Sequence, residues 1–215
     1  MKINSLSQKE AEILDKKLIY NIGIPRIVLM ENAGRGVADF IIKNTKISEC
    51  VIIISGPGYN GGDGLVAARH LHIAGRKVIA FLAGRKDRTK DETVLQIRIL
   101  EGLGVKVKEI AEIKDTGKIA KRIGQTGFLI DAVLGVGLRG EVRPLAGGII
   151  ECINSSGLKI VSVDIPSGLD TDKGVPHGAA VKADYTLTFQ APKKGSLTYS
   201  GRKFSGKVKV VKIVG

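Results

Sequence analysis

Short apolar runs alternate with helical patterns along most of this chain, and this alternation is the feature that most limits how it can fold. From residue 49 onward, runs rich in valine and isoleucine are separated by segments whose apolar residues recur at helical spacing. Continuous apolar runs are typical of strands buried on both faces, and parallel strands need a long crossover, usually a helix. We therefore expect a mostly parallel sheet with strands at 51–55, 77–82, 105–110, 128–134, 159–165, 185–190 and 207–214.

The helical patterns complete this architecture. Two helices are expected before the first strand, where Ser7 and Glu10 have the spacing of a capping box and Pro25 separates the two patterns. Strands that alternate with helices predict an α/β fold, a three-layer αβα sandwich with a doubly wound sheet. The expected helices are 7–20, 27–42, 61–74, 89–102, 115–123 and 144–155.

The whole chain, 1–215, is expected to form one domain. Its 215 residues suffice for one sizeable core, and neither a linker nor a repeat interrupts the pattern. The last run, 207–214, alternates lysines with valines and isoleucines. This alternation predicts an edge strand with one wet face and one dry face.

Composition and charge exclude several classes of protein. No apolar run approaches the roughly 20 residues of a membrane span, and the polar start lacks the pattern of a secretion signal, so a cytoplasmic protein is expected. Cys50 and Cys152 are too far apart in sequence to suggest a zinc site or a disulfide framework. The net charge of +13 is dispersed, and 4% aromatic residues are too few for a base-stacking platform. We therefore expect neither a membrane nor a nucleic-acid partner.

A glycine-rich loop follows the first expected strand and leads directly into a helix. Gly56, Gly58 and Gly61 satisfy G-x-G-x-x-G, a spacing that can bring backbone N–H groups and a helix N-terminus to a phosphate. The acidic ribose ligand of ordinary dinucleotide folds is missing, because the second strand ends in Ala-Gly-Arg-Lys at 83–86. The loop therefore either binds a ligand through Asn60 and Asp63 or is a tight turn with a helix cap.

Two acids follow later strands. Asp131 lies inside the fourth apolar run, and Asp164 ends the fifth. Because the carboxyl ends of parallel strands share one edge of the sheet, both should lie near the Asn60 loop. A buried Asp131 needs a cation, a ligand hydroxyl or a lysine as its partner, unless it caps a turn. Lys193 follows the sixth strand, and either a functional or a solvent-facing role remains open for it.

Five segments together resemble the YjeF N-terminal domain family, the NAD(P)H-hydrate epimerases. They are 30–34, 56–64, 131–141, 163–170 and 192–195, and they span nearly the whole chain in the order of the family. The resemblance implies a Rossmann-like fold and a role in nicotinamide nucleotide repair. It also implies NADHX or NADPHX as substrate, in which water has added at C6 of the reduced nicotinamide ring, and an activity that interconverts the R and S epimers.

The resemblance also implies a set of site residues. A potassium ion, one per subunit, would be held by Asn60, Asp131 and Ser167, whose oxygen atoms are hard donors suited to such a cation. A homodimer and a functional link to a separate NAD(P)H-hydrate dehydratase are expected on the same ground. The substrate would be lined by Tyr59, Asn60, Gly61, Gly62, Asp63, Gly135, Val136, Gly137, Leu138, Arg139, Gly140, Glu141 and Asp164.

Asp164 is the expected catalytic acid and base, because it lies at the sheet edge beside the loops expected to line the substrate. Loss of the C6 hydroxyl leaves a cation shared with the ring nitrogen, and water returning to the other face inverts the centre, so a group must move protons there. Two alternatives compete with this hypothesis. One is a non-catalytic nucleotide- or RNA-binding scaffold of the same fold, and the other is a redox dehydrogenase, which the missing ribose acid disfavours.

Overall fold

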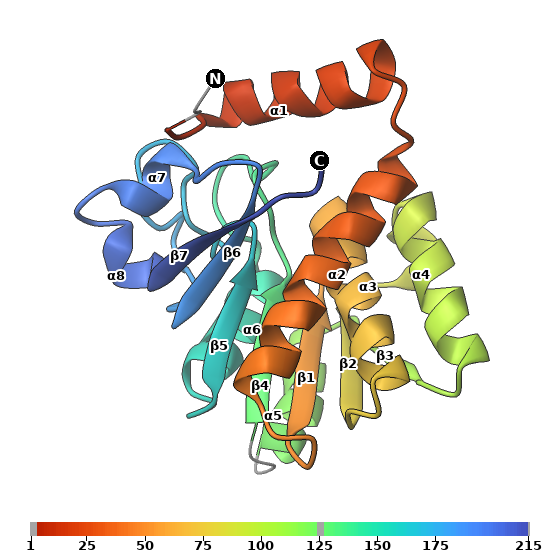
Figure 1. Cartoon of the computed structure of the whole chain (residues 1–215). Helices are drawn as coiled ribbons and strands as arrows, with labels where there is room; N and C mark the ends of the chain where they lie inside the picture. The colour runs from red at the N-terminus through yellow and green to blue at the C-terminus, as the bar shows by residue number, and fades with distance from the viewer. Residues whose placement is uncertain (1–3, 124–126, 215) are drawn as a thin grey trace.

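A parallel seven-stranded sheet forms the centre of the protein. The computed structural model describes residues 4–123 and 127–214, and within them the strand order is β3-β2-β1-β4-β5-β6-β7 with every neighbouring pair parallel (Figure 1). All seven predicted strands are confirmed. Their bounds are β1 Cys50–Ser55, β2 Val78–Ala83, β3 Val107–Ile110, β4 Gly127–Ala132, β5 Lys159–Val163, β6 Tyr185–Phe189 and β7 Lys207–Val211.

The strand order places a topological switch point between β1 and β4. The chain winds outward from β1 to β3 in one direction and then from β4 to β7 in the other. In open α/β sheets, ligands bind in the crevice outside the carboxyl ends of the strands at such a point. The loops that follow β1 and β4 flank this crevice, and they are the two glycine-rich loops of the sequence.

Helices cover both faces of the sheet, as the doubly wound prediction requires. One core cluster joins the sheet to α2, α3 and α4, and a second joins its other face to α5 and α6. Two short helices, α7 and α8, were not predicted. The bounds are α2 Arg26–Asn44, α3 Tyr59–Ile73, α4 Asp91–Gly102, α5 Gly117–Ile123, α6 Pro144–Asn154, α7 Lys194–Leu197 and α8 Arg202–Ser205.

The first helix, α1 Gln8–Lys16, lies apart from both layers and crosses the top of the molecule in Figure 1. The predicted capping box between Ser7 and Glu10 is present, and a π-helical turn over Lys17–Asn21 continues α1. Leu6 anchors the start of this segment, because its N–H donates to the Pro192 carbonyl at 2.7 Å. The N-terminal segment is therefore joined to the loop after β6.

The prediction for the last strand is only partly right. β7 is an edge strand, but its lysine-bearing face is not wet throughout. Lys209 and Val211 share one face, where the Lys209 ammonium lies 5.0 Å from the centroid of the Phe40 ring and Val211 packs against the core. Val210 on the opposite face is 46% exposed. Lys207 and Lys209 are exposed, as expected of a wet face, but the expected dry face is wrong because Val210 is exposed at the sheet edge.

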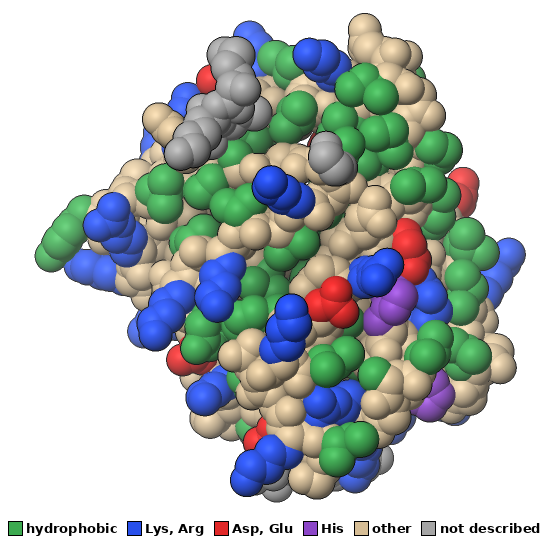
Figure 2. Space-filling view, in the orientation of Figure 1, with side chains coloured by type: hydrophobic (Ala, Val, Ile, Leu, Met, Phe, Trp, Pro, Cys, Tyr) green, Lys and Arg blue, Asp and Glu red, His purple; other side chains and the backbone are tan. Residues whose placement is uncertain are grey.

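Two further expectations concern the surface. Among the described residues, no helix is long and apolar enough to cross a membrane. Figure 2 shows the lysines and arginines of one face spread among other side chains rather than gathered in one patch. On this face, the distribution agrees with the dispersed charge expected from the sequence.

Gly34 allows α2 and α3 to pack closely, and this contact gives a stability prediction. A β-carbon at Gly34 would lie 2.4 Å from Cβ of Val66 and 2.6 Å from the Asp63 carbonyl oxygen. Gly34→Ala should lower the free energy of unfolding by about 1–3 kcal/mol in urea denaturation, the usual cost of overpacking. Gly102→Ala at the end of α4 is the control, because a β-carbon there meets nothing within 4 Å. Equal effects of the two substitutions would contradict the predicted contact.

Candidate functional site

Asp131 is a fully buried carboxylate at the end of β4. One oxygen accepts from the Ser162 hydroxyl at 2.7 Å and from the Ser167 N–H at 2.9 Å, and the other accepts from the Ser167 hydroxyl at 2.5 Å. Burial raises the pKa of Asp131, and the hydrogen bonds from the two serines oppose that rise. Among the described residues, no lysine, arginine or histidine pairs with Asp131. A buried negative charge is thus held by neutral donors alone.

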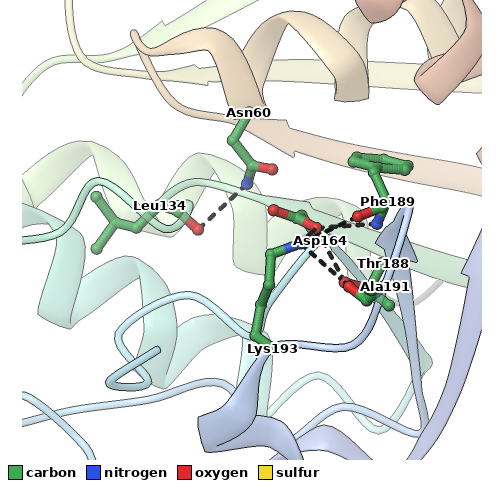
Figure 3. A network of polar contacts seen from close by, with 7 residues as sticks. All are labelled: Asn60, Leu134, Asp164, Thr188, Phe189, Ala191 and Lys193. Carbon is green, nitrogen blue, oxygen red and sulfur yellow. Dashed lines mark hydrogen bonds and ion pairs between the residues drawn. The ribbon is translucent and has the colours of Figure 1, made fainter. Parts of the chain in front are cut away.

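Ser167 connects Asp131 to the first glycine-rich loop through Leu134. The Ser167 hydroxyl oxygen accepts from the Leu134 N–H at 2.8 Å. The Asn60 side-chain amide donates to the Leu134 carbonyl at 3.2 Å, a contact drawn in Figure 3. Asn60, Asp131 and Ser167, the residues expected to hold potassium, therefore belong to one hydrogen-bonded cluster. An amide oxygen, a carboxylate and a hydroxyl are the donor types that hard cations prefer.

Asp164 begins a sharp turn after β5 and forms an ion pair with Lys193. Its backbone is left-handed, with φ of 65°, and its N–H donates to the Leu187 carbonyl at 2.7 Å. Non-glycine residues in this region are uncommon and occur often at functional sites. The Lys193 side chain is only 3% exposed, so the lysine left open by the sequence is buried and paired.

Within the part of the chain that the structure describes, all hydrogen bonds to the Asp164 carboxylate fall on one oxygen, Oδ1. This atom accepts from Lys193, from the Thr188 hydroxyl at 3.0 Å and from the Phe189 N–H at 3.0 Å (Figure 3). Oδ2 has no hydrogen-bond partner among the described residues, and the side chain is 14% exposed. The second oxygen is therefore available to a ligand, while the first is fixed in place.

Asp63 contributes another carboxyl group from the first turns of α3. Burial raises its pKa well above the ordinary value, and the negative charges of Asp164 and Asp15 act in the same direction. Arg26 and Lys193 oppose this effect with their positive charges. Sequence reasoning predicted Asp63 and Asp164 but missed Asp15 on α1 and Arg26 on α2. Neither has a sequence signal, since a polar residue on a helix is usually a solvated one.

The two glycine-rich loops pack against each other. A β-carbon at Gly56 would lie 1.8 Å from the Val133 carbonyl oxygen, and one at Gly135 would lie 3.0 Å from Cβ of Asn60. Gly61 is equally constrained, because its β-carbon would lie 1.9 Å from the Gly56 carbonyl oxygen. The structure thus brings Gly61 and Gly135 together with Asn60, as expected for one site.

The rest of the second loop points elsewhere. Val136 packs against a small cluster that contains Ile165, Leu169 and Ala180. The Arg139 guanidinium pairs with Glu12 of α1 at 3.1 Å, and the Glu141 side chain is exposed. The expected role of residues 136–141 in lining a substrate stays a prediction.

Tyr59 and Gly62 occupy two different environments in the first loop. Tyr59 is 38% exposed, and the Arg26 guanidinium carbon lies 4.1 Å from the centroid of its ring. Gly62 lies on Met30, because an added β-carbon would be 2.3 Å from Cε of that methionine. Met30 of segment 30–34 therefore packs directly against the glycine-rich loop at Gly62.

Removing the Ser167 hydroxyl should destabilise the protein. Ser167→Ala takes one donor from the buried Asp131 carboxylate and one acceptor from the Leu134 N–H. Hydrogen bonds to buried charged groups contribute about 1.5–3 kcal/mol, so the free energy of unfolding should fall by about that amount in urea denaturation. Ser155→Ala is the matched control, since Ser155 is exposed at the end of α6. A loss no larger than that of the control would show that the cluster is not needed for stability.

Comparison with known proteins identifies a matching family model and relatives that share one name. A family model described as "YjeF-related protein N-terminus" matches residues 26–195. A protein of Rhodopirellula baltica named NAD(P)H-hydrate epimerase is 34% identical over 93% of this chain and 80% of its own length. One of the same name from Limosilactobacillus fermentum is 36% identical over 94% of this chain and 92% of its own length.

Two further proteins are also similar to this chain. A protein of Thermofilum pendens named bifunctional NAD(P)H-hydrate repair enzyme Nnr is 37% identical over 98% of this chain, which spans only 40% of that protein. A solved structure of a yeast protein is 28% identical, covers 97% of this chain and 87% of its own, and superposes with a TM-score of 0.83.

Proposed function

The chain belongs to the YjeF-related N-terminal family, and from this premise we propose that it is an NAD(P)H-hydrate epimerase, an isomerase that interconverts the R and S epimers of NADHX or NADPHX. The observation that carries the proposal is the high coverage of the relatives named for this activity. The chain matches 80% and 92% of the length of two of them.

The proposal does not include a dehydratase activity. The chain spans 40% of the bifunctional repair enzyme of Thermofilum pendens, so the proposed function is limited to epimerisation. We propose that a separate dehydratase acts on the same pool of hydrated nucleotides. The homodimer and the cytoplasmic location expected from the sequence stay predictions.

Asp164 is the residue proposed to act at C6 of the substrate. Lys193 holds its carboxylate in one orientation, and Oδ2 remains available. When the hydroxyl leaves C6, positive charge spreads over that carbon and the ring nitrogen. A preorganised carboxylate beside this position stabilises the developing charge and can accept a proton from the returning water.

A potassium ion is proposed at the cluster of Asn60, Asp131 and Ser167. The residues fit such an ion, because Asp131 brings a buried negative charge that no cation of the described residues offsets. The Leu134 carbonyl, shared by Asn60 and Ser167, is a further oxygen donor in the same place. A bound ion would order both glycine-rich loops, since the cluster joins one to the other.

The scaffold alternative explains this arrangement less well. A binding module has no need for a half-buried Asp164 whose Oδ2 is unpartnered, or for a lysine buried to hold it. Burying a lysine costs free energy that its ion pair must offset. Titratable groups held in such costly surroundings cluster at functional sites. The dehydrogenase alternative has little support, since β2 is followed by Gly84 and Arg85 rather than by an acid for the ribose, and the nearby Asp87 is paired with Arg85.

Replacing Asp164 should abolish epimerisation. Heat-aged NADPH contains both NADPHX epimers, and chromatography separates them. The unaltered protein should bring an R-enriched sample to equilibrium, whereas Asp164→Asn should lower the rate by about 100-fold or more, the usual contribution of an acid or base. Asp87→Asn at an exposed ion pair is the control and should keep the rate. An Asp164→Asn rate equal to that of the control would exclude Asp164 from the reaction.

Potassium should stabilise the folded protein. At a concentration about ten times its dissociation constant, a bound ion raises the free energy of unfolding by about 1.4 kcal/mol. Thermal melting in potassium chloride should therefore occur at a higher temperature than in choline chloride of the same ionic strength. Asn60→Ala should abolish the difference, because it removes one oxygen donor. The same melting temperature in both salts would overturn the potassium site.

A further inference from the structure

A second carboxyl group, that of Asp63, lies on α3 one helical turn from the proposed potassium ligand Asn60. Both side chains therefore project from the same face of that helix. Figure 3 shows the Asn60 amide projecting toward the region that holds the Asp164 carboxylate. Resting on the proposed epimerase activity, we infer that Asp63 gives the proton to the leaving C6 hydroxyl, and that Asp164 takes the proton of the water that adds from the other face.

The surroundings of Asp63 favour its protonated form. The side chain is half-buried on α3, and among the described residues it has neither a hydrogen-bond nor an ion-pair partner. Burial raises the pKa of Asp63 well above its usual range, and the charges of Asp164 and Asp15 raise it further. Arg26 from α2 and Lys193 oppose this rise without forming an ion pair with Asp63.

Asp164 is suited to the opposite role. Its Oδ1 accepts from Lys193, Thr188 and Phe189, so the negative charge of the group is fixed by contacts. A proton placed permanently on Asp164 would leave Lys193 as a buried cation without a counterion, which is costly. Asp164 therefore starts the reaction as the carboxylate and can accept a proton only transiently, on Oδ2.

The proposed step balances without any other reactant. The Asp63 proton moves to the C6 hydroxyl, the C6–O electron pair departs with water, and the lone pair of the ring nitrogen forms a double bond to C6. A water molecule then adds to C6 from the other face and releases a proton to Asp164. One water has left and one has entered, and proton exchange with solvent returns both carboxyl groups to their starting states.

Substitution of Asp63 tests this role. In water labelled with oxygen-18, the unaltered protein should incorporate one labelled oxygen at C6 of NADHX for each inversion, as measured by mass spectrometry. Asp63→Asn should slow inversion and labelling together by about 100-fold or more, while NADHX still binds in equilibrium dialysis. Asp91→Asn is the control, because it makes the same substitution near the start of another helix, α4, at an exposed position.

A pH profile separates proton donation from a structural role. Activity should fall as pH rises through the pKa of Asp63, since the protonated form is required. Asp15→Asn removes a negative charge that raises this pKa, so the alkaline fall should move to lower pH. Arg26→Gln removes a positive charge that lowers it, so the fall should move to higher pH. Shifts in two opposite directions are not expected from a loss of folding.

The outcomes distinguish this inference from the proposed function. If the unaltered protein does not invert NADHX, the epimerase proposal fails. If it inverts NADHX but Asp63→Asn does so at the rate of Asp91→Asn, the donor role of Asp63 fails while the function stands. An alkaline fall that neither Asp15→Asn nor Arg26→Gln moves would also overturn the assignment.

Discussion

The buried carboxylate of Asp131 is the interaction on which the site depends. It lies at the end of β4 and accepts hydrogen bonds from Ser162 in β5 and from Ser167 in the turn that follows β5. A charge in this position costs several kcal/mol unless donors surround it. Meeting that requirement fixes the turn after β5 against the end of β4. The turn begins with Asp164, so the position of the proposed reacting group follows from the neutral donors around Asp131.

The second support of the site comes from the far end of the chain. Lys193 follows β6 and reaches back to Asp164, while the backbone beside it pairs with Leu6 through hydrogen bonds of 2.7 and 2.8 Å. These two bonds join the start of α1 to the loop that carries the lysine. Asp15 near the end of α1 thereby comes close enough for its charge to act on Asp63. The same loop thus orients one carboxylate directly and influences a second through α1.

Much of this arrangement can be predicted from the sequence. The rest depends on contacts between segments that are far apart along the chain. Parallel strands leave strong signals, so the β4 and β5 runs and the acids that end them are found, and topology alone places Asp131 and Asp164 at one edge. Lys193 stays ambiguous because its burial depends on Asp164, which is 29 residues away. Asp15 is missed because the crossing of α1 over the top of the molecule is a tertiary contact with no local pattern. Arg26 is missed because its contact with Tyr59 joins α2 to α3 and likewise leaves no local pattern. The dry face expected for β7 is also misread, because the alternation of residue types does not reveal that Val210 lies exposed at the sheet edge.

The glycine-rich loop after β1 shows why its G-x-G-x-x-G spacing is weak support for ordinary dinucleotide binding. Gly56 and Gly61 are required by the protein itself, because β-carbons there would lie 1.8 and 1.9 Å from backbone oxygens. They allow the loop to pack on the residues that follow β4, where Leu134 receives the Asn60 amide. Gly58 differs, because a β-carbon there meets nothing within 4 Å. Only this middle glycine, at the N-cap of α3, leaves open space beside backbone N–H groups where a phosphate can approach. The fingerprint therefore combines two packing constraints with one open position, and the proposed chemistry lies in Asn60 and Asp63, which the fingerprint does not specify.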